Sequence, residues 1–445
     1  MAADDRLDIF MNGLRIGEWL PRRNSFKYDE NWCESEYARS LSLSMPITPA
    51  NKTYQGLVVQ NYFDNLLPDS DNIRRRLAVK FKAKDTTTAA LLSAIGRDCV
   101  GAIQIVPHGS SIAQVQGIVG IPLTDAQIAQ ILRNTTSAQP IKHDFNDGLR
   151  LSIAGAQEKN ALLKHNGQWY LPIGPTPTTH ILKLPLGLVG NMAADMSSSI
   201  ENEWLCSRIA HHFALPVALC EPWSFEDSSG EVKALVVERF DRHYDNHAGI
   251  LVRLPQEDMC QVFGMNSLQK YEEDGGPTAK MVMEILRFSN NAHEDCRNFF
   301  KTLVVFWLLA ATDGHAKNFS IQLLRHGRYR LAPLYDILSS YPIIGTKNNQ
   351  MPRQKVKLAM AVESKNRHYH AFLLQARQWL EFGKKLGLPN YVVTEVLQTT
   401  HAEVDGVIAK VTQELPEHFP MWVAESIFMG MKKMNIKLAD IQRGL

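Results

Sequence analysis

One segment constrains this chain more than any other: an apolar run followed by a polar loop, a short hairpin and an aspartate. The run, Leu303 to Ala311, fits the end of a buried helix and is far too short to span a membrane. The loop reads TDGHAKN at residues 312–318, and a predicted strand pair then leads to Asp336. Because a hairpin reverses the chain, we expect Asp336 to lie near Asp313 and Asn318.

These three side chains are the ones that phosphoryl transfer requires. A carboxylate accepts the proton of the substrate hydroxyl, and hard oxygen ligands hold the Mg²⁺ that neutralises the phosphates. Asp313, Asn318 and Asp336 follow the order of the catalytic and metal-binding residues of protein kinases. Asp and Asn also cap helices and turns, and for Asp313 alone capping is the better explanation. For the three together, with a hairpin between them, we favour catalysis.

A kinase also needs a strand lysine that holds the nucleotide phosphates and a glutamate on the following helix. Lys183 stands in the apolar predicted strand 180–184, and the next predicted helix carries Glu201 and Glu203. We prefer Glu203 weakly as the partner, and an exposed edge position remains the alternative for Lys183. Upstream, residues 152–159 (SIAGAQEK) are small enough for backbone N–H groups to approach phosphate oxygens, although an ordinary tight turn has the same pattern.

Composition limits the classes of protein that this chain can belong to. Its 445 residues, 45% hydrophobic and 21% charged, are typical of a globular protein of two or three folding units. The net charge is only +2, so any nucleic-acid contact requires a local basic patch. The six cysteines lie more than ten residues apart, which argues against a CxxC metal site and predicts reduced core thiols. Charged residues occupy the place of a signal sequence, so we expect a cytoplasmic protein that makes no membrane contact.

The pattern of hydrophobic residues predicts an α+β fold with two lobes, a sheet-rich N-terminal part and a mostly helical C-terminal part. A hairpin is expected at Leu7–Phe10 and Leu14–Ile16, and a helix after the capping residues 69–71. After Asp241 we expect helices and one strand pair, Phe319–Leu324 with Tyr329–Leu334. In the middle region the predicted strands are Arg150–Ile153, Asn160–Lys164, Trp169–Ile173, His180–Leu184 and Ala234–Phe240, and the predicted helix is Ser198–Phe213.

Seven motifs are spread over nearly the whole chain. They are residues 62–69 (YFDNLLPD), 95–102 (IGRDCVGA), 152–159 (SIAGAQEK), 179–185 (THILKLP), 237–242 (VERFDR), 253–261 (RLPQEDMCQ) and 311–320 (ATDGHAKNFS). Together they resemble the HipA family of bacterial toxin kinases. The resemblance implies a serine/threonine protein kinase (EC 2.7.11.1) with a fold related to the phosphoinositide kinases. It also implies three parts: an N-terminal β-rich subdomain (1–110), a kinase N-lobe (111–240) and a helical C-lobe (241–445).

The resemblance also implies roles for individual residues, with ATP and Mg²⁺ as cofactors. Asp313 would be the catalytic base, Lys183 the phosphate-holding lysine, Asn318 and Asp336 the Mg²⁺ ligands, and Ser152 the residue that the kinase phosphorylates on itself. The implied ATP contacts are Ala154, Gly155, Ala156, Gln157, Glu158 and Lys159 of the phosphate loop, Lys183, the hinge residues Glu238, Arg239 and Phe240 that meet adenine, and His315, Ala316, Lys317, Asn318, Tyr335 and Asp336.

The family further implies a toxin–antitoxin pair. A small helix-turn-helix antitoxin of the HipB type would neutralise the kinase, and the complex would bind and repress its own operator DNA. The implied protein substrate is an aminoacyl-tRNA synthetase, by family analogy glutamyl-tRNA synthetase, whose phosphorylation halts translation and causes dormancy. Arg377, Lys384 and Lys385 could contact DNA beside the antitoxin, although for each of them a solvated helix charge is the simpler explanation.

Two other functions fit the same residues. The chain could phosphorylate a small molecule or a lipid with the same catalytic parts. It could instead be an inactive corepressor that only binds antitoxin and DNA, but the joint presence of Lys183, Asp313, Asn318 and Asp336 argues against that. Residues 343–353 and 363–370 depart from the family pattern, so the resemblance guides the C-terminal assignments less closely.

Overall fold

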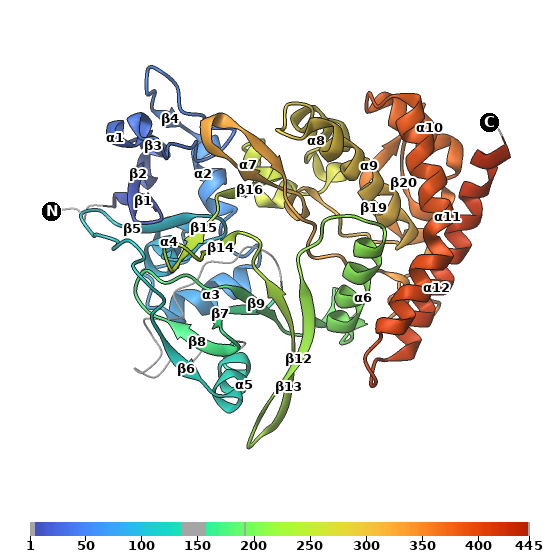
Figure 1. The fold of residues 1–445 in the computed structure, drawn as a ribbon, viewed down its shortest axis with the longest axis horizontal. Coiled ribbons are helices and arrows are strands. Elements are labelled where there is room, and N and C mark those ends of the chain that lie inside the picture. Colours follow the sequence, from blue (N-terminus) through green and yellow to red (C-terminus); the bar gives the residue numbers. More distant parts are fainter. Residues whose placement is uncertain (1–4, 136–156, 191–192, 444–445) are drawn as a thin grey trace. The chain divides into compact units, whose positions relative to one another are not determined.

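The computed structural model describes residues 5–135, 157–190 and 193–443, and the chain divides into two compact units (Figure 1). Each unit is assembled from separate segments of the chain. Unit 1 consists of Met1–Leu184, Trp223–Gln269 and Ser320–Tyr329, and unit 2 of Pro185–Pro222, Lys270–Phe319 and Arg330–Leu445.

A five-stranded sheet forms the N-terminal part of unit 1. Its strand order is β4 (Tyr54–Gln55), β3 (Ser25–Tyr28), β2 (Leu14–Leu20), β1 (Leu7–Met11) and β5 (Ile103–Pro107). The expected hairpin is confirmed, because β1 and β2 pair antiparallel around Asn12 and Gly13, which both have positive φ angles as a tight hairpin turn requires. Helices α2 (Leu57–Asp64) and α4 (Thr88–Ile95) pack in one hydrophobic core with this sheet. In that core Trp19 stacks on Phe63, with 3.9 Å between the ring centroids.

The predicted helix after residues 69–71 is α3 (Asp71–Lys80). The Ser70 side chain accepts a hydrogen bond from the backbone N–H of Ile73 at 3.5 Å, which caps the first turn. Arg74 forms an ion pair with Asp64 of α2 at 2.8 Å, so part of the basic face of α3 is neutralised within unit 1.

A six-stranded sheet forms the second part of unit 1. Its strand order is β12 (Cys220–Asp227), β13 (Gly230–Glu238), β9 (His180–Lys183), β7 (Lys159–His165), β8 (Gln168–Pro172) and β6 (Gly120–Leu123). Four of these strands were predicted, while β6 and β12 were not, and the predicted strand Arg150–Ile153 lies outside the described residues. Helix α5 (Asp125–Arg133) covers this sheet with Ile128 and Leu132, which share a core with Leu162 and Leu182.

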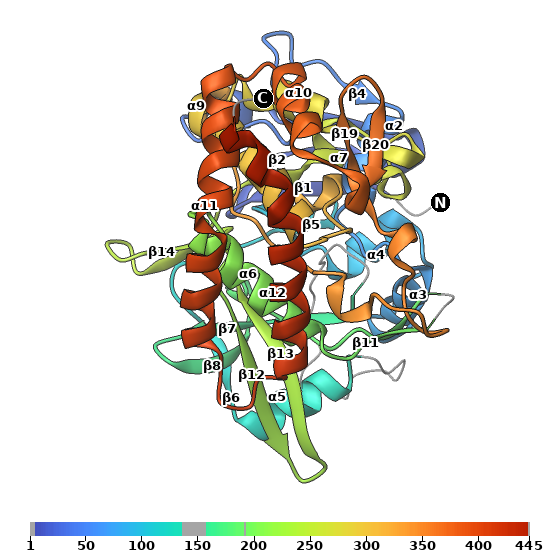
Figure 2. The same ribbon diagram turned by 90° about the vertical axis from the view of Figure 1, so that its right-hand side faces the viewer.

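Unit 2 is mostly helical. Helix α11 packs on α6, α9 and α12, and Figure 2 shows α11 and α12 running side by side. The predicted helix at 198–213 is confirmed as α6. The bounds are α6 (Ser199–His212), α8 (Ala279–Leu286), α9 (Ala292–Leu308), α10 (Ala376–Lys385), α11 (Asn390–Glu414) and α12 (Met421–Asn435), while the short helices α1 (Glu30–Glu34) and α7 (Met259–Val262) belong to unit 1.

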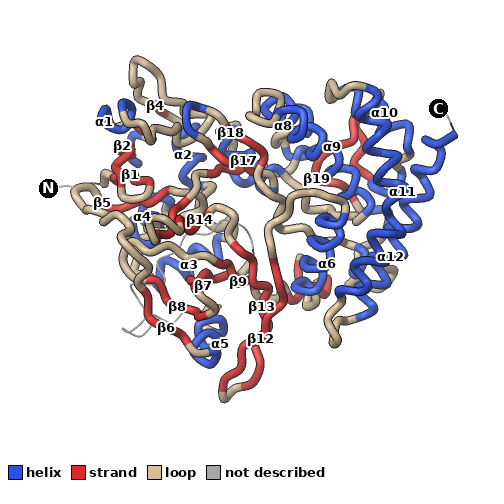
Figure 3. Tube along the Cα trace, in the orientation of Figure 1, coloured by secondary structure: helices blue, strands red, loops and turns tan. Residues whose placement is uncertain are grey.

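The expectation of a single strand pair after Asp241 was wrong, because Figure 3 shows further strands in that region. The expected pair exists as β17 and β18, in a three-stranded sheet with β16. Strand β19 is buried along almost its whole length, so it lacks the polar alternation that identifies a half-exposed strand. The strands are β14 (Arg242–Asp245), β15 (Ile250–Arg253), β16 (Gln256–Asp258), β17 (Ser320–Leu323), β18 (Tyr329–Leu331), β19 (Lys357–Glu363) and β20 (Arg367–His370), and before them come β10 (Gly187–Val189) and β11 (Ala194–Met196).

All six cysteines are free thiols, and five of them are buried, as expected. Within the described ranges, no helix is both long and apolar enough to cross a membrane.

Candidate active site

The loop at residues 312–318 follows the buried helix α9 in unit 2, as the sequence predicts. Leu303 to Leu308 form the apolar end of α9, and Ala316–Asn318 form a short 3₁₀ helix. Gly314 is required between them, because a Cβ atom at this position would lie 2.5 Å from the ring of Phe306. The packing of this aromatic ring against a glycine therefore fixes where the loop leaves the helix.

Hydrogen bonds hold the loop in one conformation. The backbone carbonyl of Asp313 accepts the Nδ2–H of Asn318 at 2.7 Å and the backbone N–H of His315 at 2.8 Å. The backbone N–H of Ala316 donates to the carbonyl of Lys270 at 3.1 Å. Asp313 and Asn318 are therefore joined directly, with the asparagine amide oriented by its donated hydrogen bond.

The Asp313 side chain is half-exposed, as a group that meets a substrate must be, while His315 beneath it is buried. The Tyr271 hydroxyl donates a hydrogen bond to Asp313 Oδ1, and His315 Nε2 lies 3.8 Å from the same oxygen. The Tyr271 and His315 rings meet edge to face at 5.0 Å. Tyr271 was not predicted as a site residue, because it lies 42 positions before Asp313 and shares no local motif with it.

Asp336 lies in the same neighbourhood, since both Asp313 and Asp336 act electrostatically on His315. Burial lowers the pKa of His315, and the two carboxylates only partly oppose that effect, so the imidazole is neutral near pH 7. Its Nδ1 atom is buried without a hydrogen-bond partner in the part of the chain that the structure describes. The next residue back, Tyr335, donates from its hydroxyl to the Lys317 carbonyl at 2.8 Å, which ties the segment before Asp336 to the loop.

The donor set of this loop suits a divalent cation. Asn318 uses its amide N–H toward Asp313, so the amide oxygen is the atom suited to a metal, and Asp336 supplies a carboxylate. Hard oxygen donors of this kind are the ligands that Mg²⁺ prefers. Asn318 and Asp336 are therefore the residues of unit 2 that would hold the ion.

Unit 1 contains the predicted phosphate-binding lysines. Lys183 in β9 is buried and lies directly opposite Lys159 of β7 in the antiparallel ladder. Residues directly opposite in such a ladder point to the same face, and two like charges there are unfavourable unless an anion offsets them. Gln157 donates from Nε2 to the Leu184 carbonyl at 2.6 Å, which fastens the start of β7 to the end of β9.

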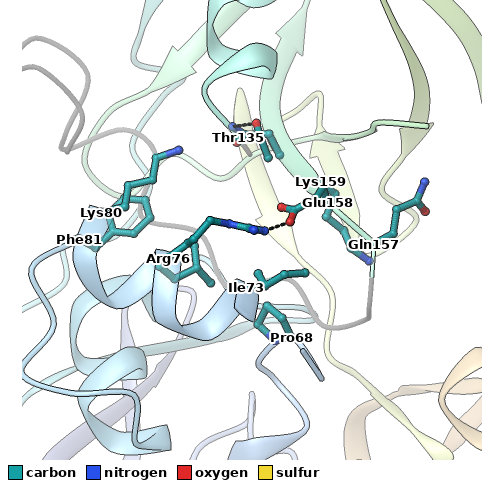
Figure 4. A pocket seen from close by; sticks show the side chains of 11 residues that line it. Pro68, Ile73, Arg76, Lys80, Phe81, Thr135, Gln157, Glu158 and Lys159 are labelled. Atoms are coloured by element: carbon teal, nitrogen blue, oxygen red, sulfur yellow. Dashed lines mark hydrogen bonds and ion pairs between the residues drawn. The ribbon is translucent and has the colours of Figure 1, made fainter. Parts of the chain in front are cut away.

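A pocket opens beside the start of β7 in unit 1 (Figure 4). Arg76 of α3 reaches across it and forms an ion pair with Glu158. Lys80 donates from Nζ to the Asn134 carbonyl at 3.3 Å, and burial, with the nearby charge of Arg76, lowers its pKa. Glu158 therefore has a protein partner, which the sequence did not predict.

The predicted hinge follows β13 in unit 1. Glu238 is exposed and Phe240 is half-buried, so both remain accessible at the end of the strand. Arg239 is buried, and its guanidinium is bonded to Asp241, to Thr178 and to the Cys99 carbonyl. Only the backbone of Arg239 is therefore placed to meet a nucleotide.

The remaining predicted residues lie in several different parts of the chain. Ser152, Ala154, Gly155 and Ala156 lie outside the described residues. Lys183 belongs to unit 1, whereas Glu201 and Glu203 lie on α6 of unit 2. Arg377, Lys384 and Lys385 are exposed on α10, where Lys385 forms an ion pair with Glu363 at 2.9 Å.

Comparison with known proteins decides the family. The family model of the HipA-like C-terminal domain matches residues 151–417, and that of the HipA N-terminal domain matches residues 7–106. The chain belongs to the HipA family. This confirms the resemblance of the seven motifs, and the two matched ranges contain all of them.

Relatives and a solved structure agree with the HipA assignment. A protein of Sinorhizobium fredii named "Putative kinase Y4mE" is 32% identical, over 86% of both chains. The "Serine/threonine-protein kinase toxin HipA" of Shewanella oneidensis is 26% identical over 99% of this chain and 96% of its own. A chain in the solved complex of HipA, HipB and operator DNA from Shewanella oneidensis MR-1 covers 98% of both chains at a TM-score of 0.77 and 23% identity. The expected mixture of helix and sheet is thereby confirmed as a HipA fold.

Proposed function

We propose that this HipA-family chain is an ATP-dependent serine/threonine protein kinase (EC 2.7.11.1) and the toxin of a type II toxin–antitoxin system. One observation carries the proposal: Asp313, His315, Asn318 and Asp336 gather around a single hydrogen-bonded loop in unit 2. The relatives named kinases support it. The proposal includes lobes of the phosphoinositide-kinase type and the three parts 1–110, 111–240 and 241–445.

In the proposed reaction Asp313 accepts the proton of the substrate hydroxyl. Its half-exposed carboxylate can reach a substrate, the Tyr271 hydroxyl donates to that carboxylate, and the Asn318 amide holds the Asp313 backbone carbonyl. His315 beneath it is neutral near pH 7, because burial lowers its pKa, so it places no positive charge beside the carboxylate. Asn318 and Asp336 would hold Mg²⁺, and the ion would neutralise charge on the ATP phosphates.

Unit 1 would bind the nucleotide. Lys183 and Lys159 stand opposite each other on neighbouring strands, and together they provide the positive charge that a polyphosphate requires. The phosphate loop would comprise Ala154 to Lys159, and the hinge Glu238 to Phe240 would bind adenine through its backbone. We propose the carboxylate of Glu203 as the partner of Lys183, with Glu201 as the alternative.

The decisive experiment is phosphotransfer to a bacterial lysate, read out as phosphopeptides by mass spectrometry. Asp313→Asn keeps the shape of the side chain and removes the proton acceptor, so it should lower the rate by about 10²–10⁴-fold while nucleotide binding persists. Activity within a few-fold of the parent protein would contradict the assignment of the base. Phosphate appearing only in lipid or small-molecule extracts would identify a different kinase class, and no transfer at all would leave an inactive corepressor.

The same spectra test two of the finer proposals, the self-phosphorylated residue and the protein substrate. Ser152 would be the self-phosphorylated residue, because a dianionic phosphate beside the phosphate loop would repel bound ATP. Ser152→Ala should therefore preserve nucleotide affinity during incubation with Mg²⁺–ATP. An aminoacyl-tRNA synthetase is the proposed protein substrate. A HipB-like antitoxin and operator DNA are the proposed partners, and Arg377, Lys384 and Lys385 are the proposed DNA contacts.

A further inference from the structure

Six side chains in the interior of unit 1 form an arginine–aspartate network: Asp98, Thr178, Arg239, Asp241, Arg242 and Arg253. The three arginine side chains are only 1–2% exposed. No part of the predicted chemistry needs this many buried charges. Buried ions are costly unless each is paired and hydrogen-bonded, so the network requires its own explanation.

Asp98 is the network residue that belongs to the N-terminal domain. It follows α4 and precedes β5, and its Oδ1 accepts from Arg253 Nε at 2.9 Å and from Arg242 Nη2 at 3.0 Å. Arg239 Nη1 lies 3.5 Å from its Oδ2. Burial would raise the pKa of Asp98, but the charges of Arg242, Arg253 and Arg239 outweigh burial and hold the pKa well below its usual range. The carboxylate is therefore ionised near neutral pH.

Asp241 binds two of these arginines, Arg239 and Arg242, from the hinge side. Arg239 donates to both of its oxygens, at 3.0 Å from Nε and at 2.8 Å from Nη2, in the bidentate geometry that planar guanidinium favours. The backbone N–H of Gly101 donates to Oδ2 at 2.7 Å. Gly101 has a φ of +72°, and a Cβ there would lie 2.9 Å from the Gln256 carbonyl oxygen, so only glycine fits this approach.

Thr178 connects the two aspartates to the sheet. Its hydroxyl donates to Asp98 Oδ2 at 2.7 Å and accepts from Arg239 Nη1 at 2.9 Å. Its carbonyl accepts Arg242 Nε at 3.0 Å, and the next carbonyl, of Thr179, accepts the Arg239 backbone N–H at 2.9 Å. The network therefore fixes both the side chain and the backbone of Arg239, the central residue of the predicted hinge.

We propose that the arginine–aspartate network positions the hinge Glu238–Phe240 for the nucleotide, with Asp98 as the positioning residue supplied by the N-terminal domain. The inference rests on the proposed kinase function and adds a role for residues 7–106. It also explains three of the seven motifs, since residues 95–102, 237–242 and 253–261 supply five of the six network residues. These residues act on affinity through backbone geometry, without touching the substrate.

The test compares two buried carboxylates of the N-terminal domain. Asp98→Asn should raise the dissociation constant for a fluorescent ATP analogue at least about tenfold, equal to about 1.4 kcal/mol, while kcat at saturating ATP changes less than about threefold. The matched control is Asp8→Asn, because Asp8 is also buried and paired with Arg15 at 2.7 Å but has no contact with the hinge. It should lower the melting temperature and leave nucleotide affinity within about twofold of the parent protein.

A second pair of variants covers the case in which Asp98→Asn fails to fold. Thr178→Val removes the hydroxyl that joins Asp98 to Arg239 and should weaken nucleotide binding, whereas Thr178→Ser retains that hydroxyl and should bind normally. Equal nucleotide affinities for the Val and Ser variants, or for Asp98→Asn and Asp8→Asn, would overturn the inference alone. A parent protein that binds no ATP analogue would refute the proposed kinase function, and the inference with it.

Discussion

Asp336 adopts a left-handed backbone conformation, with a φ of +61°. This conformation costs most residues of order 1–3 kcal/mol, although aspartate tolerates it better than branched residues do. Strain of this kind persists only where neighbours over-determine the backbone, and the Tyr335 hydroxyl bond to the Lys317 carbonyl is one such constraint. The neighbouring residues therefore fix the orientation of the Asp336 side chain, which agrees with its proposed role as a metal ligand.

Glu257 offers a test of stability that is independent of catalysis. The carboxyl is buried in β16, where Oε1 accepts the Leu43 N–H at 2.8 Å and Oε2 has no partner within the described structure. Burial raises its pKa from 4.5 to about 8, so the folded protein binds a proton that the unfolded chain releases above pH 4.5. This stabilisation is complete below pH 4.5 and is lost as the pH rises to about 8.

Glu257→Gln should remove that dependence, because the amide stays neutral. At pH 8.5 we expect the variant to have a higher melting temperature than the parent protein, and a free energy of unfolding larger by on the order of a few kcal/mol. Both differences should shrink toward pH 5. Thermal unfolding of both proteins between pH 5 and 9 measures it. If the melting temperatures of the two proteins differ by the same amount at every pH in this range, Glu257 does not have a raised pKa.

At the scale of elements, the contact between α9 and the loop after it determines the active-site geometry. Gly314→Ala places a methyl group 2.5 Å from the Phe306 ring, so the loop must move. Displacements of about 1 Å can cost about 10²-fold in rate, and we expect kcat to fall by about tenfold to a hundredfold. Steady-state kinetics measures the loss, and the added substitution Phe306→Leu should restore part of the activity.

Gly406→Ala is the matched control for Gly314→Ala. It lies in α11, where an added Cβ meets nothing within 4 Å. Alanine in a helix is favoured over glycine by about 1 kcal/mol, so this variant should be at least as stable as the parent protein and equally active. Equal activities for the two alanine variants would rule out a tight loop contact.

The elements that were predicted correctly are those whose sequence pattern lies within a few neighbouring residues. The hairpin at Asn12 follows from turn chemistry, helix α3 from a capping serine, and helix α6 from helical spacing of its apolar residues. Strand β14 (RHYD) was missed because it has almost no apolar residues, and β15 (ILVR) because it is only four residues long and pairs with β14 alone. A strand pair this short has too few residues to show a recognisable sequence pattern.

The same distinction applies to the site. The loop from Asp313 to Asn318 was predictable from its spacing and from the hairpin after it. Tyr271 and Asp98 were not, because each meets its partner across 42 or more positions of chain. The motif around Asp98 could be noticed through the family resemblance. That its carboxylate pairs with three buried arginines could be learned only from the structure.

At the scale of the whole molecule, partner binding is the main prediction. A complex with a HipB-like protein should bind operator DNA, with log affinity falling linearly against log salt, whereas the chain alone should bind little because its net charge is only +2. Replacing Arg377 and Lys384 by alanine should reduce the salt slope by about one for each residue. Fluorescence anisotropy measures both effects. Equally tight operator binding without the partner would mean that this chain reads DNA itself.

The alternation of segments between the two units has a genetic consequence. Unit 1 takes its last segment from Ser320–Tyr329, and unit 2 already begins at Pro185, so their coding regions are interleaved. No single uninterrupted stretch of the gene encodes either unit. A premature stop codon before codon 320 therefore damages both units at once, and a single crossover between related genes cannot exchange one unit intact. Such genes should diverge mainly by point substitution, with inactivating truncations giving unfolded chains instead of half-active fragments.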